Sequence, residues 1–261
     1  MSRPPSRAAF SLVELSIVLA IVALIAGGIT IGRALITSGG DRALIGDIER
    51  YDQAVDSFQE KYSALPGDFS TAANYWGQDT ATACSTAPAS ADRVPKKKTC
   101  NGNGSGQLGD SGVEYETFGA WVQLADAGFI SGSFTGTTGA GGVVNAVIGE
   151  NVPPTKLEGV GMAFMTYVGD GFTDPSTMFY AGDYGTATLI VGSEDGVGIL
   201  LKPALTVTDS WNIDTKLDDG MPQSGRIKPI LYNSPNCVTG TAYNLTYTTG
   251  PACALTVNVT G

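Results

Sequence analysis

The most informative stretch of this 261-residue chain is Phe10-Ser11-Leu12-Val13-Glu14, which is followed directly by an apolar run at residues 15–32. The run contains 18 residues and no charge, and its only polar side chains are those of Ser16 and Thr30. An 18-residue helix is about 27 Å long, close to the roughly 30 Å hydrocarbon core of a bilayer. The run therefore predicts a helix that is long enough to cross a membrane.

The charge of the chain changes sign on either side of this run. Residues 1–9 carry two positive charges, residues 10–40 are neutral, and residues 41–261 carry 12 basic and 24 acidic groups, which gives a net charge of -10. A basic start before an apolar helix is typical of a secretory signal peptide or of a single-pass anchor. In an anchor, the basic end stays in the cytoplasm and the acidic body is exported.

Neither a signal peptide nor a plain anchor explains Glu14 at the start of the apolar run. Such a carboxylate costs roughly 2.5–3.5 kcal/mol if it is carried to the bilayer centre, and intramembrane carboxylates are usually paired and functional. A cut between Ala9 and Phe10 would create a cationic partner for it, the α-amino group of Phe10. The position of Glu14 therefore indicates an assembly or pairing role for this carboxylate.

Residues 3–36 resemble the N-terminus of type IV prepilins and type II secretion pseudopilins. The resemblance rests on the short basic leader, the small residue Ala9, the stretch from Phe10 to Glu14 and the long apolar helix. In that family a prepilin peptidase cuts before the aromatic residue and methylates the new amino terminus. The resemblance places the cut between Ala9 and Phe10, with N-methylation at Phe10; the family usually has glycine where this chain has Ala9.

The resemblance implies a structural subunit of a type IV pilus-like filament or of a type II secretion pseudopilus. Its partners would be prepilin peptidase, other pilin or pseudopilin subunits and the inner membrane. Before assembly the subunit would cross the bacterial inner membrane once, with its N-terminus cytoplasmic, and afterwards it would belong to a periplasmic or cell-surface filament. In that filament the Glu14 carboxylate would meet the Phe10 ammonium of a neighbouring subunit, because a charge pair shielded from water is stronger than a surface pair.

The fold class that we expect is α+β and pilin-like, with a long N-terminal helix packed on an antiparallel sheet. We divide the chain into a leader at 1–9, a transmembrane and assembly helix at 10–36, an amphipathic continuation at 37–65 and an exported β-rich body at 66–261. The continuation carries an apolar stripe with spacings of 3 and 4 residues, which is one face of a helix. The stripe consists of Leu44, Ile48, Tyr51, Val55, Phe58 and Tyr62.

Three glycines interrupt the apolar helix, and each lowers helix propensity by about 1 kcal/mol relative to alanine. Gly27, Gly28 and Gly32 are either sites of close packing between helices or part of a segment that loosens on assembly. The amphipathic half ends near residues 64–68, where Pro66 and Gly67 break the helix.

The body contains short periodic segments separated by turns rich in Gly and Asp. We expect helices at 114–127, with Gly128 as the C-terminal cap, and at 208–217, with Thr208 as the N-cap. Expected strands are 162–168, 178–181, 186–191, 197–201, 226–232, 243–247 and 254–259. The glycines of residues 101–106 have the spacing of a dinucleotide-binding loop, but no strand precedes them and no helix pattern follows, so we assign no such function.

Four cysteines allow three disulfide pairings. Cys84 and Cys100 are 16 residues apart, as are Cys237 and Cys253. Sequential pairing would close two loops in an exported body, where disulfides are stable. No two of the cysteines have the C-x-x-C spacing of a metal or redox site.

A cluster of carboxylates follows the second body helix, at Asp214, Asp218 and Asp219. Hard oxygen ligands at a turn suit calcium, and some major pseudopilins bind calcium in a C-terminal loop, but the spacing is not that of an EF-hand. The alternative is a helix end at which the acids bond backbone N–H groups or Lys216. We expect no cofactor apart from this possible calcium.

Composition limits the remaining functions. The chain has no histidine, which removes Ser-His-Asp and Cys-His catalysis, and its acidic body does not predict a nucleic-acid interface. We therefore expect no enzymatic activity. Two alternatives stay open: a membrane-anchored periplasmic binding or adhesive protein that does not polymerise, and a secreted hydrolase behind a signal peptide.

Overall fold

The computed structural model of the chain describes residues 11–78, 99–109, 115–136, 145–166, 187–194, 196, 198–232 and 234–259, with only the backbone described at 30–38. The chain divides into two compact units, residues 1–42 and residues 43–261. We call the second unit the body. The first half of the long helix lies in the first unit, and its second half is part of the body.

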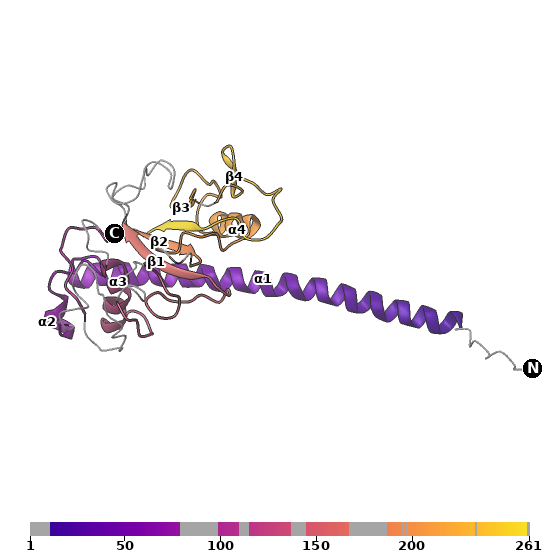
Figure 1. Ribbon diagram of the computed structural model, residues 1–261, viewed down its shortest axis with the longest axis horizontal. Helices are drawn as coiled ribbons and strands as arrows, with labels where there is room; N and C mark the ends of the chain where they lie inside the picture. The colour runs from indigo at the N-terminus through magenta and orange to yellow at the C-terminus, as the bar shows by residue number, and fades with distance from the viewer. Residues whose placement is uncertain are drawn as a thin grey trace, which may run out of the picture. The chain divides into compact units, whose positions relative to one another are not determined.

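Helix α1, Leu12–Tyr62, is continuous over 51 residues (Figure 1). Its first part has no apolar partner in the part of the chain that the structure describes, since every large apolar side chain from Leu12 to Ile29 is at least half exposed. Ile21, the most covered of them, is still 51 % exposed. The helix continues through Gly27 and Gly28 and also through Ser38-Gly39-Gly40. The predicted long N-terminal helix is confirmed.

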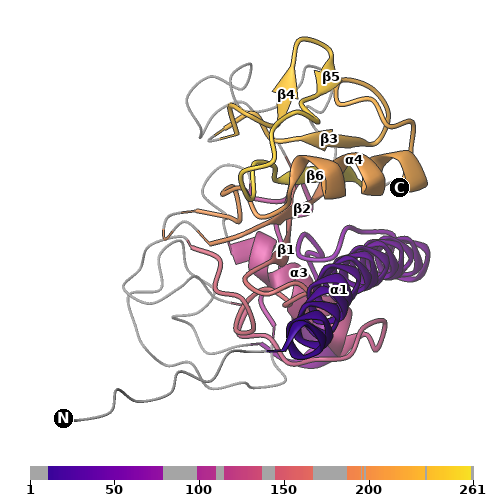
Figure 2. The same ribbon diagram turned by 90° about the vertical axis from the view of Figure 1, so that its right-hand side faces the viewer.

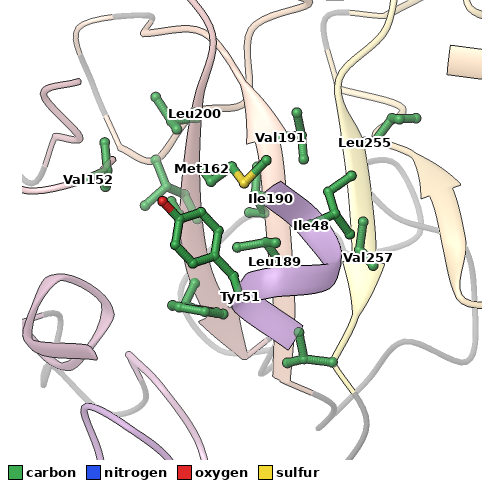
Figure 3. Packing of buried hydrophobic residues seen from close by; sticks show 14 of the residues in the cluster. Ile48, Tyr51, Val152, Met162, Leu189, Ile190, Val191, Leu200, Leu255 and Val257 are labelled. Atoms are coloured by element: carbon green, nitrogen blue, oxygen red, sulfur yellow. The ribbon is translucent and has the colours of Figure 1, made fainter. Parts of the chain in front are cut away.

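The second half of α1 packs on an antiparallel sheet, as the apolar stripe predicts. The sheet has the order β1-β2-β6-β3, with β1 at Gly161–Thr166, β2 at Ala187–Gly192, β6 at Leu255–Asn258 and β3 at Ile227–Pro229. In Figure 3, Ile48 and Tyr51 of α1 face Leu189 of β2 and Val257 of β6. The buried members of the stripe are Leu44, Ile48, Tyr51, Val55 and Phe58, while Tyr62 is half-buried.

Helix α3, Tyr115–Asp126, completes this core. Its Trp121 is fully buried, stacks on Phe164 of β1 at a ring-centroid distance of 4.4 Å and meets the Tyr51 ring edge-on at 4.8 Å. Gly128 follows with φ +80° and donates its N–H to the Ala125 carbonyl, which confirms the predicted cap. This aromatic contact joins α1, α3 and β1 in one core.

A third layer contains α4, Val207–Leu217, and a two-stranded hairpin formed by β4, Val238–Thr239, and β5, Ala242–Tyr243. Figure 2 shows this hairpin at the far end of the body from the body half of α1. The fold is therefore α+β, with an N-terminal apolar helix and an antiparallel sheet, as expected.

Several predicted details are wrong. Thr208 lies inside α4, and the N-cap is Thr206, whose hydroxyl accepts the Asp209 N–H at 3.1 Å. The strand expected at 197–201 is not formed by residues 198–201, because Gly198 has φ +86° and its isolated bridge to Asn145 is the only strand pairing in these four residues. Of the strand expected at 243–247, only the first residue belongs to β5.

The remaining differences concern helix α2 and the bounds of the strands. Helix α2, Ala72–Trp76, was not predicted; it is five residues long, too short to show a period. The strands expected at 162–168, 186–191, 226–232 and 254–259 correspond to β1, β2, β3 and β6. Within the described residues β1, β3 and β6 are shorter than expected, and β2 has the expected length but is shifted by one residue. The strand expected at 178–181 lies outside the described residues.

The glycine-rich segment at 101–109 folds around two buried acids. The Asp68 carboxylate accepts the backbone N–H groups of Gly104 at 2.6 Å, Ser105 at 3.1 Å and Gly106 at 2.7 Å. Glu116 accepts the N–H of Asn103 at 2.8 Å. Asp68 is 2 % exposed and Glu116 is fully buried, so these hydrogen bonds supply the partners that buried carboxylates need.

The same arrangement explains Gly102. A Cβ at this position would lie 2.2 Å from the carbonyl carbon of Asp68, so only glycine lets the loop approach so closely. The dinucleotide-like glycine spacing therefore serves a turn around the chain's own carboxylate.

We predict that Asp68→Asn lowers the free energy of unfolding by about 1–3 kcal/mol. The amide retains one acceptor oxygen but turns an N–H₂ group towards at least one of the three backbone N–H donors that meet this buried side chain. Urea unfolding followed by near-UV circular dichroism measures the change. Asp47→Asn is the control, because Asp47 forms a surface pair with Arg50 at 2.9 Å and such pairs contribute little; equal losses in the two variants would contradict the prediction.

Candidate functional site

The N-terminus of α1 is closed by a reciprocal pair of hydrogen bonds. The Ser11 hydroxyl accepts the N–H of Val13 at 3.3 Å, and the Glu14 carboxylate accepts the N–H of Ser11 at 2.9 Å. This is a capping box, in which a serine N-cap and a glutamate three residues later satisfy free N–H groups of the first helical turn. The S-x-x-E spacing of Ser11 and Glu14 is the sequence signal by which this cap could have been predicted.

The capping box places Glu14 at the head of the exposed apolar surface of α1. Residues 12–29 form a helix that is long and apolar enough to cross a membrane, and none of it is buried within the chain. A helix that is apolar on all sides is stable only where lipid or other protein covers it. The carboxylate near its start is negative, and one of its oxygens is held by the N–H of Ser11.

A second candidate site lies after α4, where the carboxylate oxygens of Asp214, Asp218 and Asp219 lie within 4.8 Å of one another. The structure thus brings together the three acids that the sequence indicated as possible calcium ligands. Each of the three carboxylates also accepts hydrogen bonds from other groups of the chain, either backbone N–H groups or side-chain hydroxyls.

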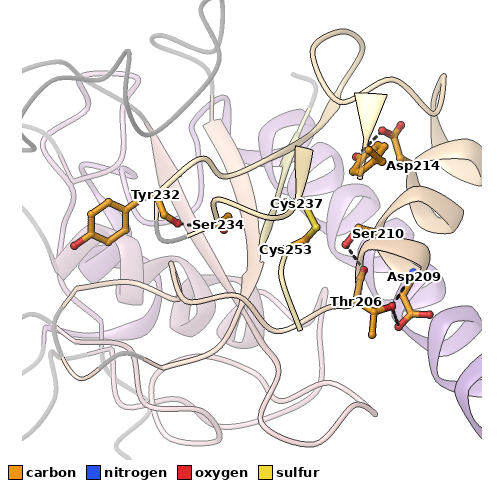
Figure 4. Close-up of a disulfide and its surroundings, with 9 residues drawn as sticks. Thr206, Asp209, Ser210, Asp214, Tyr232, Ser234, Cys237 and Cys253 are labelled. Atoms are coloured by element: carbon orange, nitrogen blue, oxygen red, sulfur yellow. Dashed lines mark hydrogen bonds between the residues drawn. A yellow bond between two sulfur atoms is a disulfide. The ribbon is translucent and has the colours of Figure 1, made fainter. Parts of the chain in front are cut away.

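Asp214 joins α4 to the β4–β5 hairpin. Its carboxylate accepts the Tyr243 hydroxyl at 2.7 Å and the Gly220 N–H at 3.0 Å, and its side chain is fully buried (Figure 4). Burial raises the pKa of this carboxyl from 3.8 to about 6, against the lowering effect of the Tyr243 hydrogen bond. Tyr243 is a partner that sequence reasoning missed, because it lies 29 residues away.

Asp218 and Asp219 hold the turn that follows α4. One Asp218 oxygen accepts the backbone N–H groups of Arg226 and Ile227, where β3 begins. Asp219 accepts the Ser224 hydroxyl at 2.7 Å and the Met221 N–H at 2.8 Å, and the Ser224 hydrogen bond lowers the pKa of its carboxyl. Acids that bond backbone N–H groups were the alternative to a calcium site in the sequence analysis. The hydrogen bonds observed are of this kind, but the N–H groups belong to the loop after α4 and not to the end of the helix.

Arg226 extends this network to α1. Its guanidinium donates to the carboxylate of Asp52, which ties the start of β3 to the body half of the helix. Oxygens of all three carboxylates already accept hydrogen bonds from the protein. Calcium binding by these acids stays a prediction.

Comparison of the sequence with known protein families gives a match in the N-terminal segment. Residues 4–30 match a family model described as the prokaryotic N-terminal methylation motif. The chain carries the type IV pilin and pseudopilin signature. A search of curated proteins and a search of solved structures gave no match.

This signature includes the capping box and most of the exposed apolar helix of the pilin-like chain. It also includes Ala9 and Phe10, which lie outside the described residues, so cleavage between them and methylation of Phe10 stay predictions. Glu14 is therefore the one predicted assembly residue whose surroundings the structure describes.

The disulfides of the pilin-like chain lie in the body. Cys237 and Cys253 form a disulfide with a Cα–Cα distance of 5.1 Å, and both residues are buried (Figure 4). This bond closes the segment that carries the β4–β5 hairpin, and it is the C-terminal pair that sequential pairing predicts. Cys100 is also disulfide-bonded, while Cys84, its expected partner, lies outside the described residues.

We predict that Asp214 makes stability depend on pH between about pH 4 and pH 7. Its pKa is higher in the folded protein than in the unfolded chain, so the folded state binds the proton more tightly. The stability that this proton contributes is complete below the unfolded pKa of 3.8 and is lost as the pH rises through about 6. Asp214→Asn, which is neutral at every pH, should therefore gain about 2 kcal/mol relative to the wild type between pH 4 and pH 7.

Urea unfolding of both proteins across this pH range measures the difference. Asp219→Asn is a control of opposite sign, since the pKa of Asp219 is lowered and its stabilising effect is lost as the pH falls. A constant difference between Asp214→Asn and the wild type at all pH values would contradict the prediction.

Proposed function

We propose that the chain is a structural subunit of a type IV pilus-like or type II secretion pseudopilus filament, without enzymatic activity. Prepilin peptidase would cut it between Ala9 and Phe10, and α1 would join it to other pilin or pseudopilin subunits. The observation that carries the proposal is the exposed apolar half of α1, headed by Glu14 and matched by the methylation motif.

The apolar half of α1 supports this proposal through its need for a partner. Residues 12–29 leave their apolar side chains uncovered within the chain, which is costly in water. A bilayer covers them before assembly, and neighbouring copies of the same helix cover them in a filament. The subunit would thus start in the inner membrane, with its basic N-terminal end cytoplasmic, and finish in a periplasmic or cell-surface filament.

Glu14 supports the assembly step. A carboxylate in an apolar setting needs a cationic partner, and the Ser11 N–H supplies only a neutral donor. The ammonium of Phe10, created by cleavage, is a partner of the right charge. Because one subunit offers the amine and the next offers the carboxylate, the pair would set the register of stacked subunits.

The mass of the mature N-terminal peptide tests the proposal against its two alternatives. A filament subunit should begin at Phe10 and carry an N-methyl group, and it should appear in the fraction sheared from cells. A chain that still begins at Met1 would favour an anchored protein that does not polymerise. A start after about residue 27 would favour a secreted protein with a signal peptide and would overturn the proposal.

We predict that the charge of Glu14, and not only its hydrogen bond to Ser11, is needed for assembly. Glu14→Val removes both, whereas Glu14→Gln keeps an acceptor for the Ser11 N–H and removes only the charge. Both variants should reach the membrane, and both should be lost from the sheared fraction. Normal assembly of Glu14→Gln would show that the capping box suffices and would contradict the charge-pair mechanism.

A further inference from the structure

Aromatic rings reach the surface of the body where α2 packs beside the C-terminal end of α1 (Figure 1). The centroid of the Tyr75 ring lies 5.4 Å from that of Tyr62, 5.4 Å from that of Phe69 and 5.8 Å from that of Trp76. Phe69 is buried, Tyr62 and Trp76 are half-buried, and Tyr75 is 62 % exposed. Tyr75 is the most exposed large apolar side chain in the described part of the body. We call Tyr62, Tyr75 and Trp76 the aromatic platform.

The aromatic platform is held from below by the core and by the backbone. Phe58 is fully buried, and its ring centroid lies 4.6 Å from that of Tyr62. The N–H of Ala73, within α2, donates to the side-chain oxygen of Asn101 at 2.8 Å. A ligand would therefore meet rings that are already ordered, which lowers the entropic cost of binding.

The surroundings of the platform expose no charge, in contrast to the acidic body as a whole. Residues 62–78 and 99–109 contain one charged side chain, Asp68, which is 2 % exposed and accepts the N–H groups of the glycine-rich loop. The two segments are adjacent, since the N–H of Gly102 donates to the carbonyl of Phe69 at 3.0 Å. Their exposed polar side chains are neutral hydroxyls and amides, among them Ser70, Thr71, Asn74 and Ser105.

A cation lies at one edge of the platform. The Lys61 ammonium is 5.0 Å from the centroid of the Tyr62 ring and 5.6 Å from that of Phe129. A single ammonium is not the cluster of Lys and Arg that binds a nucleic acid or another anionic polymer. The charge pattern therefore favours a neutral ligand.

The size of the exposed surface favours a sugar over a protein partner. A specific protein interface buries about 800 Å² on each side and needs several apolar anchors. Tyr75 is the one exposed large apolar side chain of residues 62–78 and 99–109. One sugar ring matches one aromatic ring in size, and neighbouring hydroxyls and amides can bond to the rim of the sugar.

We propose that the aromatic platform is a binding site for a neutral, β-linked polysaccharide. In a β-linked glucan the ring substituents are equatorial, so each face of the sugar carries only C–H groups, and these pack on the negative face of an aromatic ring. Tyr75 would stack on one sugar ring, beside Trp76 and Tyr62. The inference goes beyond the proposed function, because it assigns a ligand to the body and does not require a filament.

Isothermal titration calorimetry of the full chain in lipid nanodiscs, with cellohexaose as the ligand, tests the proposal. Tyr75→Ala should weaken binding by about 10-fold or more, whereas Tyr75→Phe keeps the ring and should stay within about 3-fold of the wild type. Tyr232→Ala is the matched control, since Tyr232 is a 41 % exposed tyrosine outside the platform, and it should leave binding unchanged. Maltohexaose, whose α-linkages curve the chain, should bind about 10-fold more weakly than cellohexaose.

Tryptophan fluorescence gives a measurement that leaves the platform intact. The chain has three tryptophans, Trp76, Trp121 and Trp211. In a Trp211→Phe variant, Trp76 is the half-buried indole and Trp121 is fully buried. Bound cellohexaose should therefore reduce the quenching of the emission by acrylamide, because it covers Trp76.

Four results would contradict the proposal: no binding of cellohexaose, unchanged quenching, equal affinities of Tyr75→Ala and the wild type, or an equal loss in Tyr232→Ala. Equally tight binding of maltohexaose would contradict the β-linked class. Self-association in sedimentation that Tyr75→Ala abolishes would assign the platform to a second copy of the chain and would also overturn the proposal. Urea unfolding of each variant checks that its fold is intact. The filament function fails separately, since a chain that never polymerises can still bind a glycan and a filament subunit can lack this ligand.

Discussion

The burial of one stripe of α1 against the sheet is the interaction on which the rest of this structure depends. Leu44, Ile48, Val55 and Phe58 are at most 1 % exposed, and a fully buried side chain of this type contributes roughly 1.5–3 kcal/mol. The stripe fixes which face of the helix meets β2 and β6, and Tyr51 brings in Trp121 of α3. Since the helix continues from Tyr62 back to Leu12 without a break, the same element that forms the core also presents an uncovered apolar segment.

The acidic excess of the body has a structural use. Asp68 and Asp218 both place carboxylates where glycine-rich or irregular loops leave backbone N–H groups without partners. Asp214 joins α4 to the hairpin through Tyr243, and the Cys237–Cys253 disulfide closes the segment that contains this hairpin. Short strands and long turns provide few sheet hydrogen bonds, so these charge-assisted bonds and the disulfide hold the loops in place.

Glu14 differs from the acids of the body in its surroundings. Its carboxylate accepts the N–H of Ser11 but lies beside an apolar segment, where no loop needs it and no basic side chain of residues 11–29 is available. The buried Asp68 carboxylate accepts three backbone N–H groups, whereas the Glu14 carboxylate accepts one within the described residues. This difference is the physical reason to regard Glu14 as a group that meets a partner outside the subunit.

Elements with a local and periodic signal could be predicted from the sequence alone. The apolar run at 15–32, the stripe from Leu44 to Phe58 and the cap at Gly128 follow from the spacing of neighbouring residues, because a helix brings residues three and four apart together. The N-caps Thr206 and Ser11 could also be predicted, since a cap and its partner lie within three residues, although the N-cap predicted for α4 was Thr208 and not Thr206. The contacts between distant segments are visible only in the folded chain: Asp68 with the loop at 101–109, Asp214 with Tyr243, and Arg226 with Asp52. Their partners lie 29 to 174 residues apart, and no local spacing indicates which distant N–H, hydroxyl or guanidinium group a buried carboxylate will meet.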